Sequence, residues 1–445
     1  MDIFYTLVLI VLLPLMKCDR CPAPKQCSCQ YNIIYCDHLN LTNVPEFTKP
    51  DNENMTWDIE LQYNNIKRIR NGAFQNLKLE MLLIFDNEIE VVEDDAFSGS
   101  EDTLYVLHMY NNKLTTVPSA VGKMRNLMGL DIHNNPISTI REDILRNVSS
   151  TLSGIMFGDT KMTSWPNSLN VLSNLDSIRI QNLNIPRIPH NVLNNFRNLS
   201  SFEIISTNFS NIPSSLSDRS MLEDINLEDN PMLTTESFKP ETFSKLSTLM
   251  RMTIMNSSIT ILPSIFNKLN NLFILQLENN PITSIPDHVF PLNFSSNFWF
   301  MTLKNTSLAS VPKALSNLTS LTRLDFMTSL ISEIRDNDFS NMVKLERMYF
   351  TNSPLHTVSD NAFHGLKSLK YLTLDNTFLT TVPKAMMNLP SLSELSLSNT
   401  KVVCTCSNLR WIKKWPEQSE VEIYGNCTNI RMTIALFIYK ELPKC

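Results

Sequence analysis

The side chains of this sequence best suited to chemistry are two histidines and an aspartate: His108, Asp131 and His133. Imidazole and carboxylate groups facing outward from adjacent strands could together hold a metal ion. The seven histidines of the chain are dispersed, however, and scattered surface histidines are far commoner than metal ligands. We therefore expect ordinary surface positions for these residues and no metal site.

No short motif in the chain places a nucleophile, a catalytic zinc ion or a phosphate. There is no G-x-S-x-G, no H-E-x-x-H and no P-loop, and the eight glycines form no phosphate-cradling run. The 445 residues carry 38 Lys and Arg against 44 Asp and Glu, a net charge of −6 that argues weakly against nucleic acid as a partner. We expect a protein that is not an enzyme, needs no cofactor and binds no nucleic acid.

The nine cysteines fall only at the two ends of the chain, with none between Cys36 and Cys404. A zinc site is one interpretation of the N-terminal group, although no matching histidine pair accompanies it. Disulfides are the other interpretation, and spacing alone allows three pairings of four cysteines. Cysteines confined to the ends of a repetitive chain favour disulfide-locked caps and an oxidising compartment.

The first residues read as a secretory signal. Residues 3–16 are almost wholly apolar and about as long as the apolar core of a signal peptide, too short for a membrane span of about 20 residues. The first charge is Asp2, so the usual basic start is missing. We place the signal at residues 1–18; if Cys18 leaves with it, eight cysteines remain, and otherwise Cys18 is a free or intermolecular thiol.

A repeat must position all of these side chains. Residues 127–140 read L-x-x-L-x-L-x-x-N-x-I-x-x-I, and the pattern returns about every two dozen residues. Its apolar positions can be buried only against the same positions of neighbouring repeats, which predicts a stacked solenoid. The alternation Leu130-x-Ile132 predicts a short strand, with Asp131 and His133 facing out of the pleat. Asn135 falls at the turn, where its amide can bond unpaired backbone groups.

We count fifteen repeats, and their return segments tend to alternate between two kinds. One kind carries Phe, as at Phe97, Phe339 and Phe363, and predicts short helical turns. The other carries Pro, as at Pro118 and Pro312, and predicts extended or polyproline segments. The turn residue also varies, because Thr or Ser often replaces Asn, and a hydroxyl makes fewer bonds than an amide.

This pattern resembles the leucine-rich repeat family, in particular its extracellular members with cysteine caps, of the slit, chaoptin, Nogo receptor and acid-labile subunit type. The resemblance covers residues 21–445, and it implies a right-handed α/β solenoid, a horseshoe with a parallel β-sheet on its concave face. It also implies an N-terminal cysteine cap at 19–55, about fifteen repeats at 56–403 and a C-terminal cysteine cap at 404–445. The family's cap pairings, carried over, would be Cys21–Cys29, Cys27–Cys36, Cys404–Cys427 and Cys406–Cys445.

The chain also carries ten N-x-S/T sequons, which in a secreted protein predict glycans. None lies between Asn54 and Asn147 or between Asn317 and Asn426, while Asn256 and Asn305 fall just after predicted strands, where a glycan would hinder docking on the middle of the sheet. The sequon asparagines are Asn40, Asn54, Asn147, Asn198, Asn208, Asn256, Asn293, Asn305, Asn317 and Asn426.

Outward strand positions in the first sugar-free window are almost all apolar or aromatic. Such a contiguous patch usually marks an interaction site, and aromatic residues are enriched among binding hot spots. The alternatives are that the N-terminal cap folds over it or that a homodimer buries it. The predicted protein-binding residues of this window are Met81, Leu83, Phe85, Val106, His108 and Tyr110.

The second window presents a mixed aromatic and arginine surface, which also has the composition of a hot spot. An ordinary solvated strand face is the simpler interpretation. The residues are Arg323, Asp325, Met327, Arg347, Tyr349 and Tyr371.

The sequence therefore favours a secreted glycoprotein that binds an extracellular protein in cell adhesion, guidance or matrix organisation. A non-catalytic carrier subunit of a secreted enzyme or growth factor is an alternative, as is a soluble innate-immune recognition protein. We expect no membrane span, and a homodimer is compatible with the sequence. The fold alone does not decide among these functions.

Overall fold

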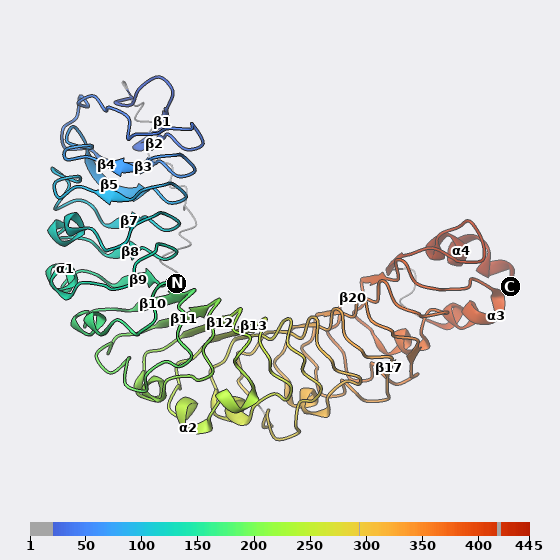
Figure 1. The fold of residues 1–445 in the computed structure, drawn as a ribbon. Helices are drawn as coiled ribbons and strands as arrows, with labels where there is room; N and C mark the ends of the chain where they lie inside the picture. Colours follow the sequence, from blue (N-terminus) through green and yellow to red (C-terminus); the bar gives the residue numbers. More distant parts are fainter. Residues whose placement is uncertain (1–20, 293, 416–419) are drawn as a thin grey trace. The chain divides into compact units, whose positions relative to one another are not determined.

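The computed structural model describes residues 21–292, 294–415 and 420–445 (Figure 1). The expected signal peptide with Cys18 lies outside the described residues, as does the sequon asparagine Asn293. The chain forms two compact units, of which one ends at Leu152 and the other begins at Ser153. Both units are built from the same repeat, and within each unit the strand of one repeat hydrogen-bonds to the strand of the next.

In the first unit, a parallel sheet begins at an antiparallel hairpin and adds one strand per repeat. The hairpin is β1 (Ser28–Gln30) with β2 (Ile33–Tyr35), and β2 pairs in parallel with the first repeat strand. The cap therefore extends the edge of the sheet. The remaining elements are β3 (Thr56–Glu60), β4 (Arg68–Ile69), β5 (Lys78–Leu83), β6 (Val91–Val92), β7 (Val106–His108), η1 (Ser119–Lys123), β8 (Gly129–Asp131) and α1 (Glu142–Val148).

In the second unit, twelve strands form a continuous parallel ladder. They are β9 (Gly154–Phe157), β10 (Ser177–Gln181), β11 (Ser201–Ile205), β12 (Asp224–Glu228), β13 (Arg251–Met255), β14 (Ile274–Gln276), β15 (Phe300–Thr302), β16 (Arg323–Asp325), β18 (Arg347–Tyr349), β20 (Tyr371–Thr373), β21 (Glu394–Ser396) and β22 (Glu422–Tyr424). Two short strands, β17 (Glu333–Ile334) and β19 (Thr357–Val358), pair on their own.

The helices of the second unit are short and lie in the return segments and the C-terminal cap. They are η2 (Asn167–Val171), η3 (Ser214–Asp218), η4 (Thr235–Ser237), α2 (Pro240–Phe243), η5 (Ser264–Lys268), η6 (Lys313–Asn317), η7 (Lys384–Asn388), α3 (Cys406–Leu409), η8 (Arg410–Lys414), α4 (Ile434–Lys440) and η9 (Leu442–Lys444). Among the described residues, no helix combines the length and the apolar character that a membrane crossing requires.

The core is the apolar column that the repeat predicts. Leu127, Leu130, Ile132, Ile137 and Ile140 are all buried, and most of the same positions are buried in the other repeats. Burying a side chain of this size stabilises the fold by about 1.5–3 kcal/mol, so the column supplies the main driving force of each repeat. Because each repeat buries its apolar side chains against its neighbours, the stack is the unit of stability.

Asparagine at the turn joins each repeat to the one before it. The Asn87 amide nitrogen donates to the carbonyl of Leu61 in the preceding repeat at 2.9 Å, and its oxygen accepts from the backbone N–H of Ile66 at 3.0 Å. Thr306, at the same position of a later repeat, donates one bond, to the carbonyl of Leu303 in its own repeat. Hydroxyl turn residues therefore leave this link between repeats weaker, as their smaller bonding capacity predicts.

The return segments differ from the prediction. The six proline segments carry 3-10 helices, η1, η2, η3, η5, η6 and η7, each starting directly after its proline. Proline itself is extended, with φ −60° and ψ 139° at Pro118, and stands at the N-cap, where its missing N–H removes no helical hydrogen bond. The phenylalanine segments are hydrogen-bonded turns, as expected, with bonds such as that from the N–H of Ala96 to the carbonyl of Glu93. The prediction of extended segments at the prolines was wrong beyond the proline residue itself.

Disulfides lock both ends of the stack. The N-terminal cap has Cys21–Cys29 and Cys27–Cys36, and the C-terminal cap has Cys404–Cys427 and Cys406–Cys445. These are the four pairs that the family resemblance implies. In the C-terminal cap, Ile412, Trp415, Ile434 and Phe437 are buried, so this cap adds an apolar core of its own at the end of the second unit.

Candidate protein-binding surfaces

The six outward residues of β5, β7 and the turns after them lie side by side, and we name this surface the aromatic face. Met81 is opposite Val106 and Leu83 opposite His108 in the parallel register, and Phe85 and Tyr110 follow at the strand ends. All six are half-buried. The cap, residues 21–55, continues the sheet through β1 and β2 and does not lie across β5 and β7. This placement leaves the aromatic face without a covering element from the described part of the cap.

A column of stacked rings runs across the turn end of this face. Phe85 stacks on Tyr110 with centroids 4.3 Å apart, and Tyr110 stacks on His133 at 4.6 Å. On the other side, Tyr63 meets Phe85 edge-on at 5.5 Å and stacks on His38 of the cap at 4.4 Å. The sequence reasoning missed Tyr63 and His38 as members, because it considered only the alternating positions of repeats two and three. The available signal was Tyr63, an aromatic residue directly before the first turn asparagine, Asn64.

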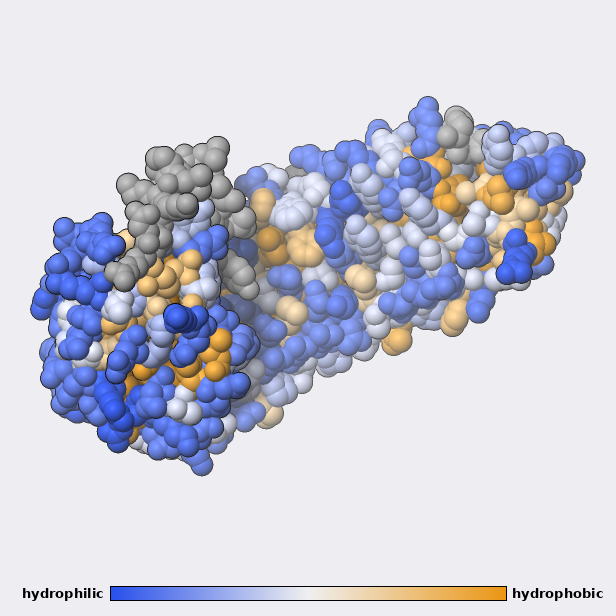
Figure 2. All heavy atoms as spheres, turned by 90° about the horizontal axis from the view of Figure 1, so that it is seen from above, coloured by the Kyte–Doolittle hydropathy of each residue, from blue (hydrophilic) through white to orange (hydrophobic). Residues whose placement is uncertain are grey.

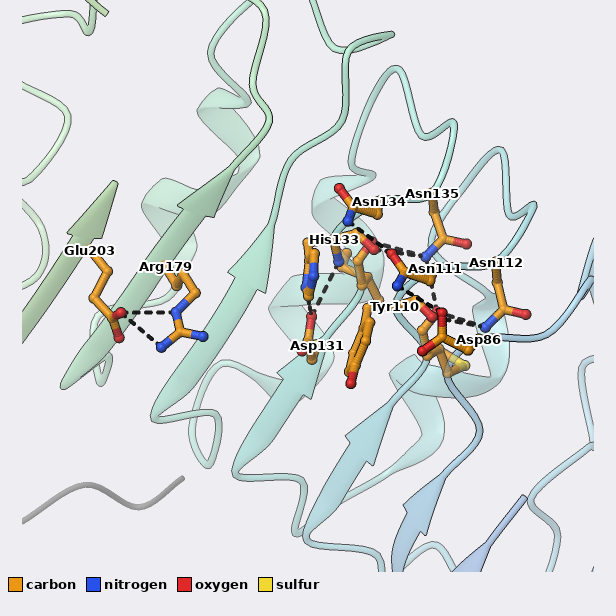
Figure 3. Close-up of polar contacts among 12 residues, drawn as sticks. Asp86, Tyr110, Asn111, Asn112, Asp131, His133, Asn134, Asn135, Arg179 and Glu203 are labelled. Carbon is orange, nitrogen blue, oxygen red and sulfur yellow. Dashed lines mark hydrogen bonds and ion pairs between the residues drawn. The ribbon is translucent and has the colours of Figure 1, made fainter. Parts of the chain in front are cut away.

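Asp131 and His133 form a buried pair, which corrects the prediction of ordinary surface positions. They are 3% and 7% exposed, and Nδ1 of His133 lies 2.5 Å from a carboxylate oxygen of Asp131 (Figure 3). The Tyr110 ring covers the imidazole from one side, which the alternation rule could not foresee. Burial also lowers the pKa of the neighbouring His108, so this imidazole is neutral at pH 7. Within the described residues, no three His, Cys, Asp or Glu side chains cluster as a metal site requires.

A ladder of side chains in left-handed backbone conformation borders the ring column. Asp86, Asn111 and Asn134 have φ between 50° and 52°, a region that Asn and Asp tolerate better than other non-glycine residues. The Asn111 amide donates to Asp86 at 2.9 Å, and the Asn134 amide donates to Asn111 at 2.8 Å (Figure 3). Beneath it, the turn residue Asn112 donates to the carbonyl of Met109 at 3.0 Å. Phe85 directly precedes Asp86, and Tyr110 directly precedes Asn111. The hydrogen-bonded ladder therefore fixes the backbone from which the two rings project.

Carboxylates line the cap-side edge of the aromatic face. Asp58 of β3 lies opposite Met81, and Glu60 lies opposite Leu83. A bulge at this pairing brings Glu80 into reach of the Thr56 hydroxyl, to which it is hydrogen-bonded. Burial, reinforced by the charge of Glu80, raises the pKa of Asp58 to about 6. The carboxylates therefore repel one another beside an apolar surface.

The second predicted set also comes together, on β16, β18 and β20, and we name it the arginine face. Arg323 lies between the rings of Phe300 and Tyr349, 5.0 and 5.1 Å from their centroids, and pairs with Asp325 at 2.9 Å. Arg347 lies over Tyr371 at 4.1 Å, and Met327 is half-buried at the end of β16. Asp325 is 4% exposed, so it serves Arg323 and is not presented to solvent. Phe300, which the sequence reasoning missed, completes the clamp on Arg323.

Elsewhere on the second unit, opposite charges pair across neighbouring strands. Arg179 of β10 pairs with Glu203 of β11 at 2.8 Å (Figure 3), and Arg251 of β13 pairs with Asp224 of β12 at 3.4 Å. Lys370 pairs with Glu346 at 3.2 Å. This face therefore neutralises most of its charge internally. In the view of Figure 2, hydrophobic residues form small patches within a mostly hydrophilic surface.

The sequon asparagines of the described chain differ in accessibility. Asn256 directly follows β13, and Asn305 lies three residues after the end of β15. Both have a left-handed backbone conformation, and the Asn305 amide donates to Asn279 at 2.9 Å. Asn256 is half-buried, as is Asn317, whose amide donates to the carbonyl of Phe290 at 2.8 Å. The exposed members are Asn40, Asn54, Asn147, Asn198, Asn208, Asn305 and Asn426.

A parallel ladder of two-dozen-residue repeats with a buried turn asparagine and cysteine caps defines a class of repeat proteins. Comparison with known families gives the same class. The BspA type leucine-rich repeat region matches residues 51–169, 115–237 and 221–332, in six copies, and a further leucine-rich repeat family matches residues 345–402. The chain belongs to the leucine-rich repeat family.

Similar curated proteins match only a part of the chain. Leucine-rich repeat-containing protein 3 of Danio rerio is 34% identical over 100 residues, which are 21% of this chain and 36% of that protein. Opticin of Canis lupus familiaris is 32% identical over 94 residues, 21% of this chain and 27% of that protein. The chain thus spans about a third of the length of these curated relatives.

Similar solved structures cover most of the chain at low identity. A leucine-rich repeat protein of Leptospira interrogans has a TM-score of 0.58 at 21% identity, over 82% of this chain and 94% of that one. The Toll–Spatzle complex of Drosophila gives 0.54 at 16% identity, over 86% of this chain and 54% of that one. The plant peptide hormone receptor RGFR1 in complex with RGF2 gives 0.53 at 20% identity, over 83% and 62%. These similarities establish the fold.

Proposed function

We propose that this protein is a secreted, non-catalytic glycoprotein that binds another extracellular protein through the aromatic face. The observation that carries the proposal is a contiguous set of half-buried apolar and aromatic side chains on an open sheet face. Soluble proteins rarely keep such a patch without a partner, and stacked aromatic rings provide rigid anchors at interfaces. Two solved neighbours, Toll with Spatzle and RGFR1 with RGF2, are complexes of the same fold with protein or peptide ligands.

The extracellular setting is supported by four disulfides at the ends of the stack, which persist only in oxidising compartments. Seven exposed sequon asparagines are compatible with glycosylation during secretion. A role in adhesion, guidance or matrix organisation fits a binding module that has no catalytic motif.

The test is affinity capture of the tagged, secreted protein from extracellular fluid and membranes, with mass spectrometry. Phe85→Glu/Tyr110→Glu places two charges in the ring column, and Arg347→Glu/Tyr371→Glu makes the matched change on the arginine face. We expect the first variant to lose the captured partner and the second to keep it. Secretion and an unchanged circular dichroism spectrum show that each variant is folded. A partner retained by the first variant and lost by the second would move the site to the arginine face and refute the proposal.

A further inference from the structure

We propose that the part of the partner that docks on the aromatic face is a cationic segment, rich in lysine or arginine and carrying apolar side chains. This inference rests on the proposed function and adds the chemical class of its ligand. The inference follows from two features of the aromatic face: its side chains are apolar, and its edge carries negative charge.

The charge on this sheet face is almost entirely negative. Asp58 and Glu60 point outward from β3, and Glu80 projects at the bulge of β5. The one cation that the same strands carry is Lys78, at the start of β5, where its ammonium group donates to Asn54 at 3.3 Å. Across the described part of the first unit, no lysine or arginine forms an ion pair with Asp58, Glu60 or Glu80.

The side chain that follows these carboxylates along the same row adds no positive charge. Gln62, which continues the outward row of β3 towards Phe85, is 8% exposed and gives its amide N–H to Glu60 at 3.0 Å. Lysine and arginine side chains are pure donors, and they would complement the carboxylates of this edge.

The ring column adds a third feature that favours a cation. Tyr63 is 47% exposed and lies between the cap and Phe85, on the side of the face where Glu60 is found. Aromatic rings attract ammonium and guanidinium groups through the negative faces of their π-systems. The apolar stems of lysine and arginine would in turn pack on Met81 and Leu83.

The same charges argue against the other occupants considered for this face. In a two-fold dimer, the surface would meet itself, and the carboxylates of both copies would be brought together. Nucleic acids and anionic lipids carry the wrong sign. A basic protein segment is therefore the occupant that the chemistry of this surface favours.

The experiment selects peptides from a random 12-residue phage library on the immobilised, secreted full-length protein. The wild type is compared with Phe85→Ala/Tyr110→Ala, which removes two rings without adding charge and so locates the site, and with Asp58→Asn/Glu60→Gln, which removes two charges without changing side-chain size. Glu46→Gln/Glu90→Gln, at exposed positions off the sheet strands, removes the same charge elsewhere in the unit. Binding of the selected peptides is then measured by fluorescence anisotropy at two salt concentrations.

We expect peptides at least twofold enriched in lysine and arginine, which lose about tenfold in affinity with Asp58→Asn/Glu60→Gln and less than twofold with Glu46→Gln/Glu90→Gln. Peptides that need Phe85 and Tyr110 but show no such enrichment, or that bind the Asp58/Glu60 variant unchanged, would overturn the cationic ligand and leave the binding face intact. Selected peptides indifferent to Phe85→Ala/Tyr110→Ala would overturn both the ligand class and the proposed site.

Discussion

The aromatic face of the first unit and the arginine face of the second are built on the same repeat but treat charge in opposite ways. On the arginine face, Arg323 is held by two rings and by Asp325, so its charge is satisfied within the protein. On the aromatic face, Asp58 and Glu60 have no cationic partner among the described residues. The repeat prescribes the inward residues alone, so the outward positions are where two stretches of one solenoid can differ in function.

The two units also differ in the turns that support these faces. Every repeat that follows the N-terminal cap up to β8 has asparagine at the turn, namely Asn64, Asn87, Asn112 and Asn135, and all four are buried. The arginine face rests on hydroxyls instead, such as Ser329, Ser353 and Thr377. Asn87 donates to carbonyls of the preceding repeat and of its own. Ser353 also reaches the preceding repeat, where its hydroxyl oxygen accepts from the backbone N–H of Ser329 at 3.3 Å. Because an amide makes more hydrogen bonds than a hydroxyl, we infer that the aromatic face stands on the better-fixed backbone.

The largest effect on stability should come from removing one of these amides. Asn112→Ala deletes the bonds to the backbone N–H of Ile89 and to the carbonyls of Ile84 and Met109, all buried, and should lower the free energy of unfolding by about 3 kcal/mol. Thr306→Ala deletes one bond and should cost about 1 kcal/mol. Denaturant unfolding followed by circular dichroism measures both. Equal losses would remove the distinction between the two kinds of turn.

The rings and the carboxylate that hold Arg323 should make the next largest contribution to the stability of the fold. Arg323→Ala leaves Asp325 buried without its cation and removes two ring contacts, so a destabilisation of about 2 kcal/mol is expected. The matched control is Arg347→Ala, which removes an exposed side chain over one ring and should cost about 0.5 kcal/mol or less. Thermal unfolding of the two variants side by side compares their losses of stability. A larger loss for Arg347→Ala would show that the arginine face is not satisfied internally.

Asp58→Asn should change the free energy of unfolding by a smaller amount and in the opposite direction, so that the variant is stabilised. Because the folded pKa of Asp58, about 6, lies above its ordinary value of 3.8, the folded state loses stability as the pH rises through this interval. The variant should therefore be more stable than the wild type at pH 7, by about 1 kcal/mol. This is less than the full shift of the Asp58 pKa would give, because the carboxyl group is partly solvated. At pH 4 the difference should vanish. A variant less stable than the wild type at pH 7 would show that Asp58 stabilises the fold.

The sequence alone predicted the repeat, its buried positions, the turn asparagines and the grouping of the two outward sets. These features depend on residue type and period, which the chain displays directly. The ring column across repeats and the burial of Asp131 and His133 depend on how side chains of successive turns overlap, and period does not encode this. The prediction for the proline segments failed for a similar reason. Each proline is itself extended, as predicted, but a 3-10 helix begins at the residue after it.

The central claim is that the aromatic face binds the partner and the arginine face does not. The most direct measurement is the equilibrium affinity of the partner captured from extracellular fluid for the wild type, Phe85→Glu/Tyr110→Glu and Arg347→Glu/Tyr371→Glu. We predict a loss of about 100-fold for the first variant, as truncation or charging of two hot-spot residues produces, and a change within about threefold for the second. An affinity unchanged by Phe85→Glu/Tyr110→Glu, with folding intact, would contradict the account.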